Sequence, residues 1–112
     1  MDVTEERFEE LVGAALDGLP GAIGELLDNV VVLVEDGRRT GPLGLYEGHP
    51  RTEREGYGLM NMPDRIRLFR LALGAACTTE QQLIDEVRIT VVHEIGHHLG
   101  IDDERLHELG WG

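Results

Sequence analysis

Three side chains within five residues have the types and the spacing to hold a metal ion and use it: His93, Glu94 and His97. If this segment is helical, His93 and His97 lie about 40° apart around the axis and one turn apart along it, so both imidazoles reach one point in space. Glu94 lies about 60° from His97, which places a carboxylate beside the same point. There it can take a proton from a water molecule held by the ion. The spacing therefore predicts a metal site with a general base, Glu94, next to it.

A catalytic zinc ion usually has three protein ligands and one open position, so the chain must supply one more ligand. Gly100 can adopt a positive φ, end the helix and turn the chain back toward His97. The residue six positions after His97 is Asp103. We predict that His93, His97 and Asp103 bind Zn²⁺, because two imidazoles and a carboxylate with an open position suit that ion. The alternative third ligands are Asp102, Glu104 and His107.

The length of the whole pattern makes chance an unsatisfactory explanation. In shuffled chains of this composition the short pattern HExxH would arise in roughly 2–3% of cases, whereas HExxHxxGxxD would arise in roughly one in 4,000. The longer pattern therefore carries the evidence for a metal site.

The surrounding residues predict the helix that positions this pattern. Thr79 and Gln82 form a capping-box signature. Aliphatic side chains then recur every four residues, as expected of a buried helical stripe; they are Leu83, Val87, Val91, Ile95 and Leu99. His93 and His97 flank this stripe, which suits the wall of a cleft.

An amphipathic helix and a short second helix are expected before the sheet. Apolar residues at helical spacing predict the first helix, with Asp2 and Glu5 as its capping box; they are Phe8, Leu11, Val12, Ala15, Leu16 and Leu19. Residues 23–27 allow a further turn or two of helix.

Three segments have strand patterns. Residues 30–34 form a β-branched apolar run that predicts a central strand covered on both faces. Residues 43–46 form a shorter strand in which Gly44 leaves room for another backbone. Residues 65–71 begin with alternating arginine and aliphatic residues, which indicates a half-exposed strand. Residues 47–64 are expected to be a long loop, and residues 102–109 a last short helix. We therefore predict a single α+β domain over residues 1–112.

Other polar residues have a functional and a structural interpretation. Glu86 and Thr90 lie before the histidine pair on nearly the same face, where they either orient an imidazole or form a solvated edge. His98 is expected to be a supporting or surface residue. Three residues from elsewhere in the chain are candidates for contact with a substrate carbonyl: Tyr46, His49 and Tyr57.

The charge of the chain excludes several classes of partner. It holds 22 acidic residues and 10 basic ones, and the net charge is -12. Nucleic acid and anionic membrane surfaces would be repelled.

No apolar run is long enough to span a bilayer, and the first residues are acidic where a secretory signal would be basic. The single cysteine, Cys77, is expected to be buried and reduced, which fits a cytoplasmic protein.

Five segments resemble the small bacterial zincin-like metallopeptidase family, once catalogued as a domain of unknown function. They are residues 8–12, 15–20, 43–48, 63–66 and 92–100. The resemblance implies a minimal zincin core, in which a small mixed sheet of about three strands packs against an N-terminal helix and the HExxH helix. It also implies that His93, His97 and Asp103 bind the metal and that Glu94 is the base. The nine residues after Asp103 contain no methionine, so they hold no counterpart of the methionine turn of larger metzincins.

These observations predict a zinc-dependent peptidase that hydrolyses peptide bonds. Two alternatives remain open at the level of sequence. One is a zinc hydrolase acting on a small amide. The other is a non-catalytic, metal-stabilised binding or regulatory module. The expected partner is thus a peptide or small amide substrate, and neither nucleic acid nor membrane.

Overall fold

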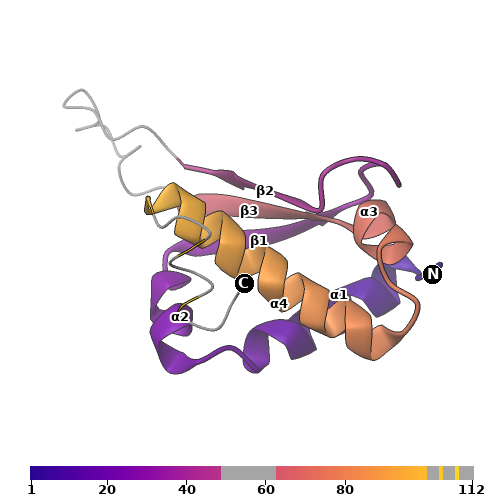
Figure 1. The fold of residues 1–112 in the computed structure, drawn as a ribbon, viewed down its shortest axis with the longest axis horizontal. Helices are drawn as coiled ribbons and strands as arrows, with labels where there is room; N and C mark the ends of the chain where they lie inside the picture. The colour runs from indigo at the N-terminus through magenta and orange to yellow at the C-terminus, as the bar shows by residue number, and fades with distance from the viewer. Residues whose placement is uncertain (49–62, 101–103, 105–107, 109–112) are drawn as a thin grey trace.

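A small mixed sheet with helices packed against it forms the framework of the protein (Figure 1). The computed structural model describes residues 1–48, 63–100, 104 and 108. In chain order the elements are α1 (Glu5–Asp17), α2 (Gly21–Leu26), β1 (Val30–Glu35), β2 (Gly44–Glu47), β3 (Asp64–Phe69), α3 (Arg70–Ala75) and α4 (Glu80–His98). This arrangement confirms the predicted α+β class, with a small mixed sheet of three strands packed by an N-terminal helix and by the helix of the histidine pair. Most of the loop expected at residues 47–64 and of the helix expected at 102–109 lies outside the described residues.

The central strand is β3, and β1 lies at one edge of the sheet. The strand order is β1-β3-β2, with β1 parallel and β2 antiparallel to β3. The prediction that residues 30–34 form a central, doubly covered strand is therefore wrong. Val31 is 40% exposed because it lies on the face of the sheet away from the core. On that face Arg67 of β3 pairs with Glu35 of β1 and Glu47 of β2.

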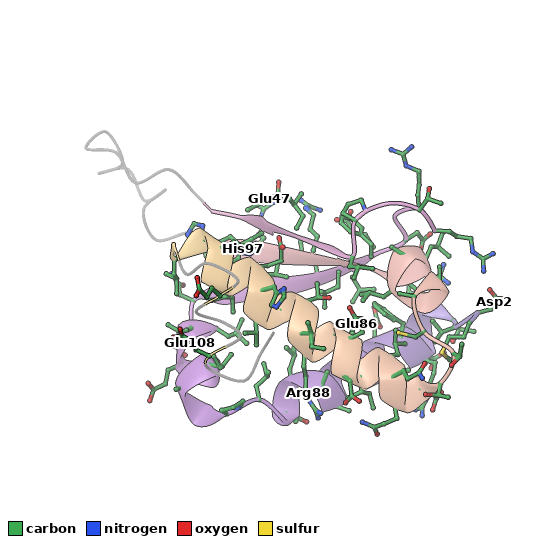
Figure 2. The ribbon with its side chains drawn as sticks, viewed as in Figure 1. Asp2, Glu47, Glu86, Arg88, His97 and Glu108 are labelled. Carbon is green, nitrogen blue, oxygen red and sulfur yellow. The ribbon has the colours of Figure 1, made fainter. Side chains whose placement is uncertain are left out.

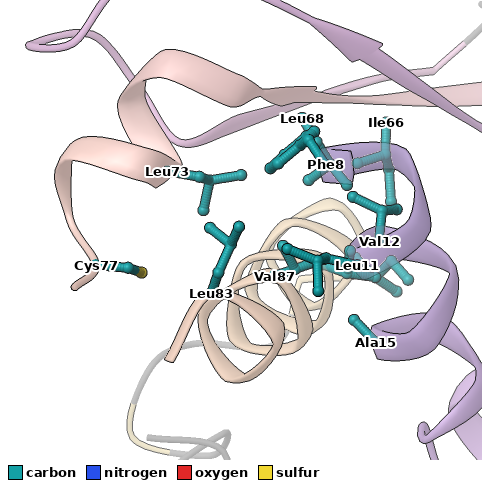
Figure 3. Close-up of a cluster of buried hydrophobic side chains, with 12 residues drawn as sticks. Phe8, Leu11, Val12, Ala15, Ile66, Leu68, Leu73, Cys77, Leu83 and Val87 are labelled. Atoms are coloured by element: carbon teal, nitrogen blue, oxygen red, sulfur yellow. The ribbon is translucent and has the colours of Figure 1, made fainter. Parts of the chain in front are cut away.

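The core lies between the sheet and the two longer helices (Figure 3). Ile66 and Leu68 of β3 are buried at alternate positions, as expected for a strand with one covered face. The helical residues that pack on them include Phe8, Leu11, Val12 and Ala15 of α1 and Leu83, Val87, Val91 and Ile95 of α4. Leu99 was expected to continue this stripe, but it is 53% exposed because α4 ends at His98. Cys77 is buried, as predicted.

The helix ends follow the sequence signals in part. The Thr79 hydroxyl accepts a hydrogen bond from the Gln82 backbone N–H at 3.1 Å, which confirms the predicted cap of α4. The N-cap of α1 is Thr4 and not Asp2, since the Thr4 hydroxyl accepts from the Arg7 N–H. Gly100 has a φ of 82°, which confirms the left-handed turn predicted after the histidines. Helix α3 was not predicted, because its first residues were assigned to the preceding strand.

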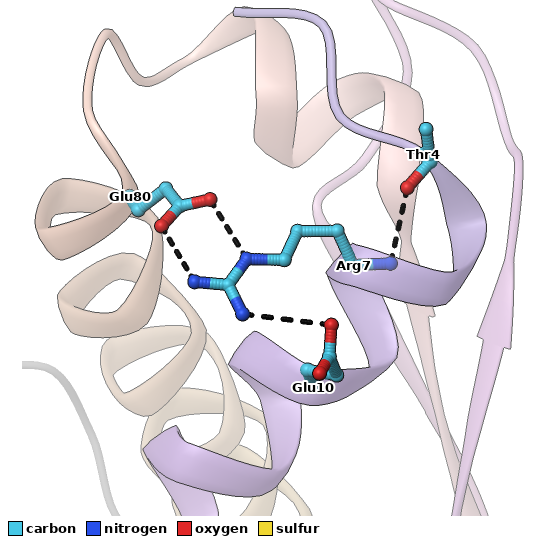
Figure 4. Close-up of polar contacts among 4 residues, drawn as sticks. All are labelled: Thr4, Arg7, Glu10 and Glu80. Atoms are coloured by element: carbon cyan, nitrogen blue, oxygen red, sulfur yellow. Dashed lines mark hydrogen bonds and ion pairs between the residues drawn. The ribbon is translucent and has the colours of Figure 1, made fainter.

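Two arginines fix α4 against α1. The guanidinium of Arg7 donates two hydrogen bonds to Glu80, at 2.8 and 2.7 Å, and also reaches Glu10 (Figure 4). This bidentate pairing lowers the pKa of the Glu80 carboxyl. Further along α4, the Nε of Arg88 donates to the Ala15 carbonyl at 3.0 Å, close to the end of α1. These contacts add to the core packing of α4 on α1, and α4 carries the candidate metal ligands. No helix in the described part of the chain is long and apolar enough to cross a membrane.

Candidate active site

The last two turns of α4 carry His93, Glu94 and His97, on the helix predicted from the sequence. The ring centroids of His93 and His97 are 6.0 Å apart, with 43° between the ring planes. A zinc–nitrogen bond of about 2.0–2.1 Å places each ring centroid about 3.2 Å from the metal, so two imidazoles on one tetrahedral ion have centroids about 5.2 Å apart. The observed separation is about 0.8 Å longer, so the two rings must turn slightly toward each other to share one zinc ion.

The predicted third ligand cannot be placed beside this pair. Asp103 lies outside the described residues, as do the alternatives Asp102 and His107. Glu104 is described and is exposed. Within residues 1–48, 63–100, 104 and 108, no group of three His, Cys, Asp or Glu side chains is arranged to hold a metal. Gly100 has the positive φ that the predicted turn requires.

Two glycines, Gly44 in β2 and Gly48 just after it, allow the edge strand to pack closely on α4. A Cβ atom added at Gly44 would lie 2.7 Å from the Thr90 methyl carbon, and one added at Gly48 would lie 2.8 Å from the His98 ring. Tyr46 lies between these glycines and stacks on the ring of His98, with centroids 4.1 Å apart. The added Cβ at Gly44 would also lie 3.2 Å from the Arg67 carbonyl oxygen of β3. The sequence suggested room for another backbone at Gly44, and the space is shared by that backbone oxygen and a helix side chain. Thr90 is only 6% exposed, so it is not part of a solvated edge.

Glu94 is held by the main chain of this strand. The Tyr46 backbone N–H donates a hydrogen bond to Oε1 of Glu94 at 3.1 Å. The Leu43 carbonyl accepts from the Phe69 N–H of β3. Because hydrogen-bonding direction alternates along an antiparallel strand, the backbone groups of Gly44 and Tyr46 point away from β3. The Glu94 carboxylate therefore satisfies one donor on the edge of β2 that no other described strand covers, and this contact fixes its direction.

A second polar cluster surrounds the Tyr46 side chain. Its hydroxyl donates to Asp64 at 2.6 Å, and the Nε2 of His98 lies 3.7 Å from the same carboxylate. Asp64 is 8% exposed. The cluster holds β2, β3 and the end of α4 together. His98 was expected to be either a supporting residue or a surface residue, and in this cluster it supports the packing. Tyr46 was expected to reach a substrate carbonyl, but its hydroxyl is directed to Asp64. His49 and Tyr57, the other such candidates, lie outside the described residues.

A groove of about 330 Å³ runs between the start of β2 and α4. It is lined by Pro42, Leu43, Gly44, Glu86, Ile89, Thr90, His93 and Glu94. Glu86 and His97 both project from α4, with Glu86 nearer the middle of the helix (Figure 2). The groove therefore brings a predicted metal ligand and the predicted base next to β2, an edge strand among the described residues. A separate pocket of about 500 Å³ lies beyond Tyr46, with Asp64 and His98 in its wall.

Sequence reasoning missed Asp64 and the role of Gly48. The alternation Gly44-x-Tyr46-x-Gly48 is a readable signal, because two glycines on one face of a strand indicate close packing. Asp64 has no comparable signal, since its partners are distant in the chain.

Comparisons with known proteins found a family and a solved structure to which this chain is similar. Residues 27–111 match the family described as zincin-like metallopeptidase. A solved structure of a conserved hypothetical protein from Thermus thermophilus is similar, with a TM-score of 0.62 and 26% sequence identity. The similarity covers 87% of this chain and 94% of the other. No curated protein matches the chain.

Proposed function

Because this chain belongs to the zincin-like metallopeptidase family, we propose that it is a zinc-dependent peptidase that hydrolyses peptide bonds. The observation that supports this most directly is the groove beside β2. There His93 and Glu94 line one cavity, and His97 lies one turn further along α4, with its ring centroid 6.0 Å from that of His93.

The proposed roles follow from the donor types. His93, His97 and Asp103 would hold the ion, with the two imidazoles supplied by α4 and the carboxylate by the chain beyond Gly100. When bound, zinc polarises a carbonyl and lowers the pKa of water to about 7. Glu94 would take a proton from the attacking water and deliver it to the leaving amine. Its Oε1 is held by the Tyr46 N–H, so its other oxygen is the one placed to exchange that proton.

The peptide would lie along the open edge of β2. The outward backbone groups of Gly44 can pair with an extended chain, as a sheet edge does when it accepts a further strand. Such a chain would pass over the groove that contains His93 and Glu94. This arrangement supports a peptide as the substrate over a small amide, because it offers main-chain partners to an extended chain beside the bond to be cleaved.

Two substitutions at Glu94 separate catalysis from structure. Glu94→Gln keeps an oxygen that can accept from the Tyr46 N–H but removes the base. Glu94→Ala removes both. With the zinc-loaded protein and a broad library of quenched fluorescent peptides, we expect both variants to lose cleavage by at least about 100-fold, in line with the contribution of a general base. Glu25→Gln, an exposed carboxylate on α2, is the matched control and should keep full activity. Unchanged cleavage by Glu94→Gln would refute the role of Glu94 as the base.

One observation favours the non-catalytic alternative. Glu94 already accepts a hydrogen bond from the sheet, so it has a structural role that does not require catalysis. If this role is the main one, the wild-type protein binds zinc but cleaves no peptide of the library, and Glu94→Gln is as stable as wild type while Glu94→Ala is not.

A further inference from the structure

The groove beside β2 carries negative charge along its length. Its lining contains two carboxylates, Glu86 and Glu94, and no arginine. Glu94 is paired with the Tyr46 N–H. Glu86 is half-buried, and the described residues give it no hydrogen bond or ion pair. A carboxylate that faces a groove without a protein partner favours a cationic ligand there.

The walls next to Glu86 are apolar. Ile89 is 37% exposed although it is a large aliphatic residue, and Pro42 and Leu43 line the opposite side of the groove. A lysine or arginine side chain combines an aliphatic stem, which packs on apolar surface, with a charged head that stays near a counter-charge. The groove therefore presents the two surfaces that such a side chain needs, in neighbouring positions.

The spacing along α4 relates this position to the proposed reaction. Glu86 precedes Glu94 by eight residues, which is about 12 Å along a helix axis. An extended peptide covers that distance in roughly three to four residues. A peptide bound along the edge of β2 with its scissile bond near Glu94 therefore brings a residue within about four positions of that bond close to Glu86.

We propose that Glu86 determines substrate specificity by binding the cationic side chain of a lysine or arginine in the peptide substrate. The inference rests on the proposed peptidase function, since it takes the same groove as the path of the substrate. The net charge of -12 acts in the same direction, because it attracts basic peptides at long range.

Binding to an inactive protein tests the proposal without turnover. The zinc-loaded Glu94→Gln protein is titrated with blocked hexapeptides of alanine in which one position carries arginine, norleucine or glutamate. Amide chemical shifts of Gly44 and Ile89 report binding in the groove. At one of the positions we expect the arginine peptide to bind about three- to tenfold more tightly than the norleucine peptide, and the glutamate peptide to bind most weakly. Adding Glu86→Gln should remove the preference, and adding Glu25→Gln should leave it intact.

The outcomes distinguish this proposal from the proposed function. Equal binding of arginine and norleucine peptides at every position, or a preference that survives Glu86→Gln, overturns the role of Glu86 even if the wild-type protein cleaves peptides. Absence of groove binding by all the peptides overturns it as well. Conversely, a Glu86-dependent preference for arginine supports it even if the wild type cleaves nothing, in which case only the peptidase function fails.

Discussion

Substitution of Gly44 by alanine tests the packing that places β2 on the candidate active site. The new Cβ would lie 2.7 Å from the Thr90 methyl carbon and 3.2 Å from the Arg67 carbonyl oxygen. Carbon atoms in contact normally lie about 3.5–4.0 Å apart. Thr90 is buried, and the Arg67 oxygen belongs to the backbone of the central strand, so neither can move freely. The strand must therefore shift away from α4.

The magnitude follows from two opposing terms. Overpacking of this kind costs about 1–3 kcal/mol. Gly44 does not have a positive φ, so the lower entropy of alanine in the unfolded chain offsets about 0.4–1 kcal/mol of that cost. We expect a net loss of about 1–2 kcal/mol. For a chain of 112 residues, each kcal/mol changes the melting temperature by about 4 °C, so Tm should fall by about 4–8 °C.

A second substitution shows whether Thr90 is the cause. Thr90→Ser removes the methyl group that the new Cβ would meet. Thermal and urea unfolding of the two single variants and the double variant should reveal a favourable coupling of about 1 kcal/mol. Gly13→Ala is the control, because no atom lies within 4 Å of a Cβ built there, and alanine should stabilise that helix by up to about 1 kcal/mol. A Gly44→Ala protein as stable as wild type, or a double variant with no recovery, would refute the packing argument.

Three further predictions concern stability and reactivity. The pKa of Glu80 is lowered by Arg7, so its contribution to stability is present above about pH 4.5 and is lost as the pH falls through the folded-state value; the Tm difference between wild type and Glu80→Gln should shrink between about pH 5 and pH 3, and a constant difference would contradict this. Arg88→Ala removes the 3.0 Å hydrogen bond to the Ala15 carbonyl and should lower the free energy of unfolding by about 1–2 kcal/mol in urea titrations, whereas a change below about 0.3 kcal/mol would count against the contact. Burial raises the pKa of the Cys77 thiol, so a disulfide reagent at pH 8 should modify it at least about tenfold more slowly in the native protein than in urea; equal rates would show that the thiol is accessible.

The features that local spacing determines were predictable from the sequence. Helix α4, its Thr79 cap and the positive φ of Gly100 each depend on a few neighbouring residues. The convergence of His93 and His97 follows from helical geometry alone. The sequence alone therefore predicts the two candidate metal ligands and identifies Glu94 as the nearby carboxylate.

The features that depend on distant contacts were not predictable in the same way. The apolar run of β1 resembles that of a buried strand, but strand order depends on pairing with β3, more than 30 residues away. Likewise, no local pattern connects Tyr46 to Asp64 and His98. The hydrogen bond between the Tyr46 N–H and Glu94 joins residues 48 positions apart and involves a backbone group that is the same for every residue type except proline.

Anomalous diffraction at the zinc absorption edge, from crystals of the zinc-loaded protein, tests the proposed metal centre most directly. The proposal predicts one strong anomalous peak at the end of α4, about 2.0–2.2 Å from a ring nitrogen of His93, a ring nitrogen of His97 and a carboxylate oxygen of Asp103. Glu94 should lie close to this peak without binding the ion. A crystal with no peak between His93 and His97, or a peak coordinated by a different set of side chains, would contradict the account.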